Sequence, residues 1–173
     1  MVKVILPCIL LALFLPVFSQ KKDKKGVAWQ TVEAVQKLAA SEKRPILIDV
    51  YTDWCMYCKV MDNTIWNQQK VSNYLKDNFY AIKFNAESKE AVDWMGQTFE
   101  YKSTYKVHML AAQWLGGNMV YPSTVIVPVS GEPIIVPGVI NKKEIEPILV
   151  YFGEKHNLKT DWKTFKENYK STW

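Results

Sequence analysis

The sequence contains few of the residues that mark unusual classes of protein. Seven Gly and eight Pro among 173 residues exclude a collagen-like or low-complexity chain, and three Cys are too few for a disulfide scaffold. His is rarer still, with two residues in the whole chain. The composition is 49% hydrophobic and 23% charged, which predicts one globular domain that buries its own core without a structural metal.

Positive charge is in surplus, but it lies at the two ends of the chain. The formal net charge is +5. Residues 20–25 hold four Lys against one Asp, and residues 154–173 hold five Lys against three acidic residues. The body between them is close to neutral. Binding to nucleic acid needs Lys and Arg clustered on the folded surface, so we expect no nucleic-acid partner.

The one long hydrophobic run lies near the N-terminus. Lys3 precedes an uncharged apolar run over residues 4–18, and Ser19 follows it. This pattern predicts a cleaved signal peptide, because a membrane-spanning helix needs about 20 apolar residues. We expect an exported protein, periplasmic or secreted, without stable membrane insertion after signal cleavage; an uncleaved anchor is the alternative. The chain then divides into a signal peptide (1–19), a basic N-terminal arm (20–26), a folded domain (27–153) and a C-terminal tail (154–173).

Two cysteines remain after the predicted signal peptide, Cys55 and Cys58. A disulfide across so short a loop removes little entropy from the unfolded chain and so stabilises the fold little. This pair is therefore a candidate redox centre. A structural zinc site needs four nitrogen or sulfur ligands, and only His108 and His156 could add to the pair. We therefore expect no metal, although the spacing alone is compatible with redox chemistry or with coincidence.

The surroundings of the cysteines predict a strand followed by a helix. Residues 45–51 (PILIDVY) are apolar and β-branched, which is typical of a buried central strand. Apolar residues recur at mostly helical spacing over residues 60–66, and residue 52 or 53 can cap this helix. Cys55 then lies in the first turn, where unpaired backbone N–H groups and the helix dipole favour a thiolate over a thiol.

Residues 47–59 (LIDVYTDWCMYCK) resemble the active-site segment of thioredoxins. In both, an apolar strand with an internal Asp leads to a Trp, here Trp54, directly before the Cys-x-x-Cys pair. Asp49 stands six residues before Cys55, where thioredoxins carry a buried aspartate. The chain is identified as a member of the thioredoxin-like superfamily. It is most similar to exported bacterial thiol-disulfide oxidoreductases related to the C-terminal domain of transmembrane thiol reductases.

Two further segments carry this resemblance. Residues 80–85 (YAIKFN) are similar to the next strand of the family, in which a lysine, here Lys83, pairs with the buried aspartate. Tyr121 and Pro122 precede an apolar strand, as in the cis-proline loop of the family. The resemblance implies an α/β thioredoxin fold, with a central mixed β-sheet flanked by helices.

The chain departs from the family pattern in a surplus segment over residues 87–106, before the cis-proline loop. Apolar residues from Ala91 to Phe99 follow helical spacing, so we expect a helix there. Pro147 is predicted to interrupt the last helix of the domain, because proline removes a backbone donor. His108 lies outside the apolar face of residues 107–114 and is expected to be solvated.

The resemblance implies a thiol-disulfide oxidoreductase whose redox group is the Cys55–Cys58 pair, without an organic cofactor. Cys55 would attack the substrate, and Cys58 would resolve the mixed disulfide. Asp49, paired with Lys83, would help to deprotonate Cys58. We expect a monomer that acts on protein or small-molecule disulfides and exchanges electrons with an upstream thiol donor or acceptor. The expected substrate contacts are Trp54, Tyr121 and Pro122.

The dipeptide between the cysteines bears on the direction of electron flow. Met56 and Tyr57 stand where oxidising or isomerising relatives have a histidine, and the absence of that histidine favours a reducing or neutral role. Two alternatives to an oxidoreductase stay open. One is a non-catalytic thioredoxin-fold binding module, and the other is a Cu(I)-handling protein with His108 as a third ligand.

Overall fold

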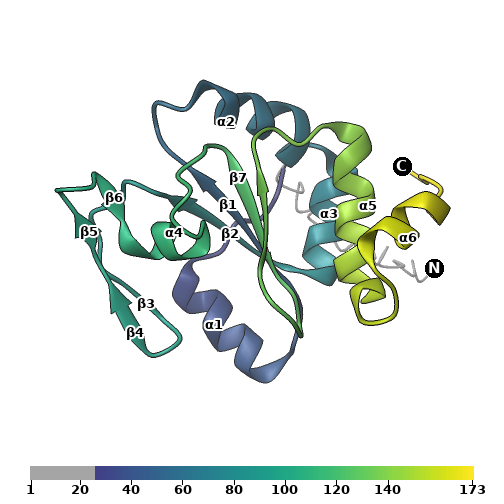
Figure 1. The fold of residues 1–173 in the computed structure, drawn as a ribbon, viewed down its shortest axis with the longest axis horizontal. Coiled ribbons are helices and arrows are strands. Elements are labelled where there is room, and N and C mark those ends of the chain that lie inside the picture. The colour runs from purple at the N-terminus through teal and green to yellow at the C-terminus, as the bar shows by residue number, and fades with distance from the viewer. Residues whose placement is uncertain (1–25) are drawn as a thin grey trace, which may run out of the picture.

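The structure is a computed structural model that describes residues 26–173; the predicted signal peptide and all but the last residue of the basic arm lie outside the described residues. A four-stranded sheet forms the centre (Figure 1), in the order β2-β1-β7-β8. β1 runs parallel to β2 and antiparallel to β7, and β8 pairs antiparallel with β7. This is the mixed sheet that the resemblance implies. The strands are β1 (Ile46–Tyr51), β2 (Tyr80–Asn85), β7 (Ser123–Val127) and β8 (Ile134–Pro137).

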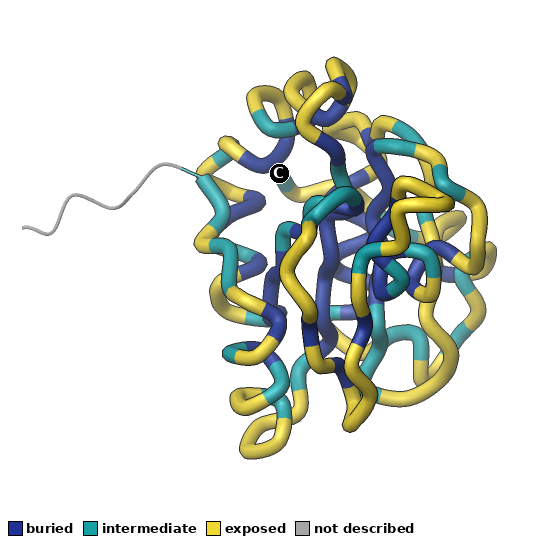
Figure 2. Tube along the Cα trace, turned by 90° about the vertical axis from the view of Figure 1, so that its left-hand side faces the viewer, coloured by how far each residue is buried: buried dark blue, intermediate teal, exposed yellow. Residues whose placement is uncertain are grey.

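Helices cover both faces of the sheet, which is why β1 is apolar along most of its length. Ile48 and Val50 pack with the helices of one face, whereas Leu47 points to the opposite face. Asp49, two residues beyond Leu47, shares that second face. Figure 2 shows the buried strands at the centre of the molecule and the exposed segments around them. The first face carries α1 (Val32–Ser41) and α4 (Met109–Trp114); the second carries α2 (Met56–Met61), the π-helical turn η1 (Asp62–Trp66), α3 (Gln69–Asn78) and α5 (Lys142–Gly153).

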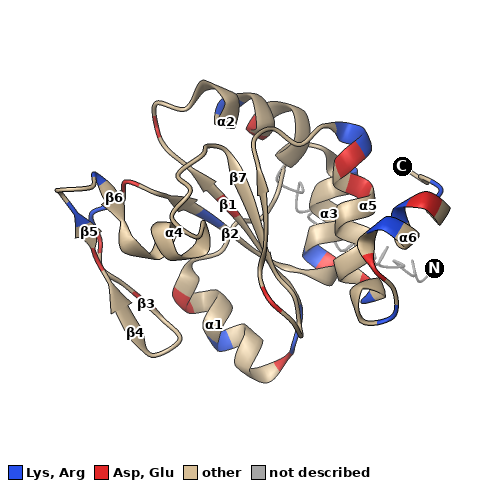
Figure 3. Ribbon diagram, in the orientation of Figure 1, with Lys and Arg blue, Asp and Glu red and all other residues tan. Residues whose placement is uncertain are grey.

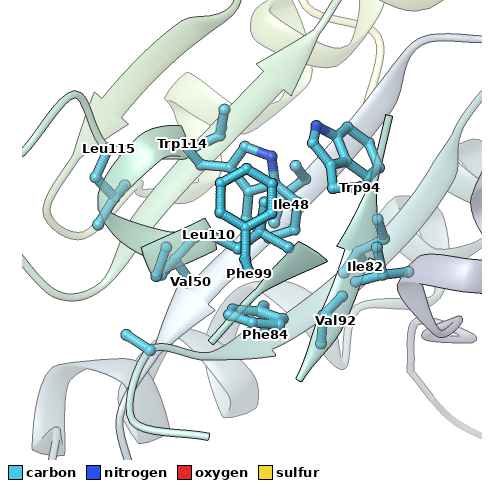
Figure 4. Close-up of a cluster of buried hydrophobic side chains, with 14 of the residues drawn as sticks. Ile48, Val50, Ile82, Phe84, Val92, Trp94, Phe99, Leu110, Trp114 and Leu115 are labelled. Atoms are coloured by element: carbon cyan, nitrogen blue, oxygen red, sulfur yellow. The ribbon is translucent and has the colours of Figure 1, made fainter. Parts of the chain in front are cut away.

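The surplus segment between β2 and α4 is not helical, so the prediction from apolar spacing is wrong. Met95 and Gly96 both have positive φ, 49° and 80°, as in a two-residue hairpin turn, and this reverses the chain. The hairpin packs against α4, where the rings of Trp94 and Trp114 meet edge to face (Figure 4). Two antiparallel ribbons result: β3 (Val92–Trp94) with β4 (Gln97–Phe99), and β5 (Tyr101–Lys102) with β6 (Val107–His108).

Two further expectations are wrong. His108 is fully buried rather than solvated: one ring nitrogen lies 2.9 Å from the carbonyl oxygen of Glu90, and the other accepts a hydrogen bond from the backbone N–H of Leu110. Pro147 lies inside α5 without interrupting it. Proline removes only one helical hydrogen bond there, and the largely buried face of α5 holds the helix in place.

Residues 154–173, expected as a tail, fold against the domain. They form the short helix η2 (His156–Leu158) and α6 (Trp162–Asn168), and Phe165 is buried. The last residues close over Glu146, a buried carboxylate of α5. α1, α5 and α6 each carry charged residues of both signs (Figure 3). Across residues 26–173, none of the helices combines the length and apolar character that crossing a membrane requires.

Candidate active site

The two cysteines lie just after β1, at the start of α2. Their Sγ atoms form a disulfide of 2.06 Å, and only 4% and 3% of the surface of Cys55 and Cys58 is exposed. Cys55 itself is the N-cap of α2, in place of residue 52 or 53, because the backbone N–H of Cys58 donates to Cys55 Sγ at 3.0 Å. In the reduced pair, a donor held there favours the thiolate of Cys55.

Exposed apolar side chains surround the nearly buried disulfide. Trp54, Met56 and Tyr57 are 65%, 68% and 67% exposed. The rings of Trp54 and Tyr121 meet edge to face, with centroids 6.0 Å apart, and the peptide bond between Tyr121 and Pro122 is cis. The structure therefore brings the cis-proline loop beside the active-site turn. A partner must pack closely against these side chains to reach sulfur.

Glu87 also lies at the rim of exposed side chains around the disulfide, which Trp54, Met56, Tyr57 and Tyr121 form. The sequence patterns missed Glu87. Its Oε1 accepts a hydrogen bond from the indole N–H of Trp54 at 3.1 Å. Asn85 links this residue to the active-site turn: its amide oxygen accepts from the backbone N–H of Glu87, and its amide nitrogen donates to Asp53 Oδ2, both at 2.9 Å. Burial, together with the charge of Glu87, raises the pKa of Tyr121 to about 12. The signal in the sequence was the position of Glu87, two residues after a predicted strand that ends at the site.

Asp49 and Lys83 are brought together on the α2 face of the sheet. The two residues are direct partners in the parallel pairing of β1 with β2, and Lys83 Nζ lies 3.3 Å from Asp49 Oδ2. Lys83 also forms an ion pair with Asp62 of η1 and lies 4.9 Å from the centroid of the Tyr51 ring. One ammonium group is therefore shared between two carboxylates. Asp62, one helical turn after Cys58, was also missed.

Because Lys83 shares its ammonium group with Asp62, it neutralises the negative charge of Asp49 only in part. Asp49 is 1% exposed, and this burial raises its pKa to about 6. The charge of Lys83 opposes the rise, whereas the negative charge of Asp62 adds to it. A carboxyl group with a pKa near 6 takes up and returns protons close to neutral pH, which suits general acid–base chemistry beside a thiol.

The ligand set for a metal is poor in the described chain. Both ring nitrogens of His108 are engaged with Glu90 and Leu110, so His108 does not act as the third ligand expected for Cu(I) handling. Within residues 26–173, no group of three or more His, Cys, Asp or Glu side chains is arranged to hold a metal ion. The two Cys sulfurs are bonded to each other.

Comparison with known proteins places this geometry in a family. The family model of the thioredoxin-like domain matches residues 32–153. Two thiol:disulfide interchange proteins DsbD are similar in sequence. The protein of Ralstonia nicotianae is 33% identical over 61 residues, which cover 32% of this chain and 10% of that protein. The protein of Pseudomonas fluorescens is 41% identical over 39 residues, which cover 22% of this chain and 7% of that protein. The chain thus matches at most a tenth of the length of these curated relatives.

Solved structures show the same fold at low sequence identity. A thioredoxin-fold protein from Helicobacter pylori has a TM-score of 0.55 at 18% identity, covering 72% of this chain and 81% of that chain. A putative disulphide-isomerase from Bacteroides thetaiotaomicron has a TM-score of 0.52 at 20% identity, covering 79% and 97%. The family model covers most of the chain and includes the site. The chain therefore belongs to the thioredoxin-like family and carries the Cys-x-x-Cys disulfide of a thiol-disulfide oxidoreductase.

Proposed function

We propose that this protein reduces disulfide bonds of exported proteins, outside the cytoplasm, through the Cys55–Cys58 couple. The observation that carries the proposal is the partly compensated carboxylate of Asp49 on the sheet face that α2 covers, which provides a proton acceptor near neutral pH. The hydrogen bond from the Cys58 N–H to Cys55 Sγ supplies the other requirement, a stabilised thiolate at Cys55. The apolar run at residues 4–18 and the DsbD relatives support an extracytoplasmic site of action.

The reaction consists of two exchanges that balance in electrons and protons. The Cys55 thiolate attacks one substrate sulfur, so that a mixed disulfide forms and the other substrate sulfur leaves as a thiolate that takes a proton. Cys58 then gives its proton to Asp49, and the resulting thiolate attacks Cys55 Sγ. The second substrate sulfur leaves as a thiolate and takes up the proton that Asp49 holds, which returns Asp49 to its ionised form. Two electrons pass from the protein dithiol to the substrate, and a thiol donor must restore them.

The substrate is held by the exposed rim of the disulfide. Trp54 and Tyr121 offer aromatic surface for packing, and the backbone beside Pro122 offers hydrogen-bonding groups for an extended segment. Because the cysteines are nearly buried, a flexible polypeptide segment fits this site better than a rigid surface.

A trapping experiment tests the assignment of the two cysteines. The Cys58→Ser variant should accumulate covalent adducts with substrate through Cys55, because nothing resolves the mixed disulfide. The Cys55→Ser variant is the matched control and should accumulate none. Equal trapping by the two variants would reject the assignment.

The direction of electron flow is tested by the equilibrium of the pair with glutathione buffers. A reduction potential near or below about −230 mV supports the reducing role. A potential of about −120 to −180 mV would instead assign the protein to the oxidases or isomerases.

A further inference from the structure

Three buried polar atoms on the α2 face of the sheet have no hydrogen-bond partner among the described residues. They are Asp49 Oδ1, Thr124 Oγ1 and Trp66 Nε1. Asp49, Thr124 and Trp66 are 1%, 0% and 2% exposed. Buried polar atoms are nearly always paired, because they lose their hydrogen bonds to water. Three such atoms in one region need a common explanation.

The register of the sheet places two of them side by side. Asp49 of β1 is directly opposite Thr124 of β7 in the antiparallel pairing, and directly opposed side chains leave the same face about 5 Å apart. Leu47 and Ile126, two positions away along each strand, both belong to the core beneath α2. The hydroxyl of Thr124 is therefore within reach of the Asp49 carboxylate, directly or through one water molecule.

Trp66 approaches the same carboxylate from η1. Its ring belongs to the core beneath α2, and its N–H acts toward Asp49 as a donor that lowers the pKa of the carboxyl group, although the pair does not meet full hydrogen-bond geometry. The other titratable groups that act on Asp49 are Lys83 from β2, Asp62 from η1 and Tyr51 from β1. Lys83 contacts Oδ2, which leaves Oδ1 for a different partner.

We propose that Thr124, assisted by Trp66, is a positioning residue for the resolving step: its hydroxyl donates a hydrogen bond, directly or through one water molecule, to Oδ1 of the ionised Asp49 carboxylate. This bond stabilises the carboxylate before it takes the proton of Cys58, and it fixes the orientation of the acceptor. In the step itself the S–H bond of Cys58 breaks and an O–H bond forms on Asp49, with no net change in charge. The role in the reaction rests on the proposed function, but the hydrogen bond does not.

The titration of Asp49 in the oxidised protein tests the hydrogen bond without any reaction. Its carboxyl signal is followed by infrared or carbon NMR spectroscopy and assigned with Asp49→Asn. Thr124→Val removes the hydroxyl and keeps the shape of the side chain, so the titration midpoint should rise by about one pH unit. Thr124→Ser keeps the hydroxyl and should titrate like the wild type. Trp66→Phe should shift the midpoint in the same direction.

An unchanged midpoint in folded Thr124→Val would overturn the proposal. If that variant does not fold, Thr124→Ala takes its place, with the same expectation and the same contrary result. The reaction is then measured as the pH dependence of substrate release from the mixed disulfide with both cysteines present. Its midpoint should move with the Asp49 titration.

These two measurements separate this inference from the proposed function. A shifted Asp49 titration in a protein that shows no disulfide exchange would support the hydrogen bond and reject the proposed function. Exchange with an Asp49 titration that Thr124→Val leaves unchanged would support the proposed function and reject the hydrogen bond.

Discussion

The indole N–H of Trp54 donates a hydrogen bond to Glu87 across 33 residues of sequence. Trp54 directly precedes Cys55, and Glu87 is the first residue of the surplus segment that separates β2 from α4. The bond therefore ties the active-site turn to the part of the chain that departs most from the family pattern. Trp54 is 65% exposed, yet its indole N–H is bonded to Glu87 and its ring packs edge to face with the ring of Tyr121.

Removal of the Glu87 acceptor should weaken reaction with protein disulfides. Glu87→Ala frees the ring of Trp54, so we expect kcat/KM for a protein substrate to fall about fivefold, the equivalent of one hydrogen bond of about 1 kcal/mol. Glu87→Gln keeps a carbonyl oxygen as acceptor and should stay near the wild type. An equal loss in both variants would show that the charge of Glu87, and not the orientation of Trp54, is what matters.

Asp62 should raise the pH at which Asp49 takes up a proton. Its charge adds to the rise in the pKa of Asp49, and it competes for the ammonium group of Lys83. Asp62→Asn should therefore lower the pKa of Asp49 from about 6, and the pH midpoint of the resolving step should fall with it. Asp53→Asn is the matched control, because it removes a carboxylate near the site that does not contact Lys83. A midpoint that shifts equally in both variants would contradict this account.

Asp49 should make the folded state less stable as pH rises. Its pKa is about 6 in the folded protein against an ordinary value of 3.8, so between about pH 4 and 6 the folded state binds more protons than the unfolded chain. The resulting penalty is complete above this window and amounts to about 3 kcal/mol at most. Asp49→Asn should raise the free energy of unfolding of the oxidised protein at pH 7, and the gain should vanish below about pH 4. A gain independent of pH, measured by denaturant unfolding, would contradict the assignment.

Glu146 should be required for the C-terminal segment to stay folded on the domain. Burial alone would raise its pKa, but the hydrogen bonds from Ser171, Thr172 and Tyr169 outweigh burial, so its pKa lies below the ordinary value. Its contribution is therefore present above the ordinary pKa of a glutamate and is lost as pH falls through the lowered value. Glu146→Gln should cost about 1–3 kcal/mol of stability at pH 7, read as a lower Tm.

The matched control for Glu146 is Glu167→Gln, which removes an exposed carboxylate of the neighbouring helix α6. This change should leave Tm nearly unchanged. The reduction potential of the Cys55–Cys58 pair should be the same in both variants. A Tm loss of similar size in both would mean that net charge, and not the contacts of the C-terminal residues, determines the effect.

Local patterns in the sequence predicted the parts of this molecule that depend on neighbours along the chain. The apolar run at residues 45–51 predicted the central strand, and the positions of Asp49, Lys83 and Pro122 relative to the cysteines followed from the resemblance to thioredoxins. Strand pairing then brought Asp49 and Lys83 together, because adjacent strands of a sheet place aligned residues on the same face.

Local sequence patterns gave wrong predictions where contacts between residues far apart in the sequence determine the conformation or the burial. The spacing of residues 91–99 predicted a helix, but the left-handed backbone of Met95 and Gly96 turned the segment into a hairpin that buries its apolar side chains against α4. His108 was expected in solvent, yet it lies in the core because its two ring nitrogens find backbone partners there. Burial of a polar ring depends on partners that periodicity does not reveal.

The sequence by itself therefore determined the family, the redox-active pair and the strand that carries the buried aspartate, because these are encoded in residues close together along the chain. Only the tertiary structure decided which charges and donors surround that aspartate. Lys83, Asp62, Trp66 and Thr124 come from three separate elements, β2, η1 and β7. Their effect on Asp49 depends on distance and burial, which are properties of the folded arrangement.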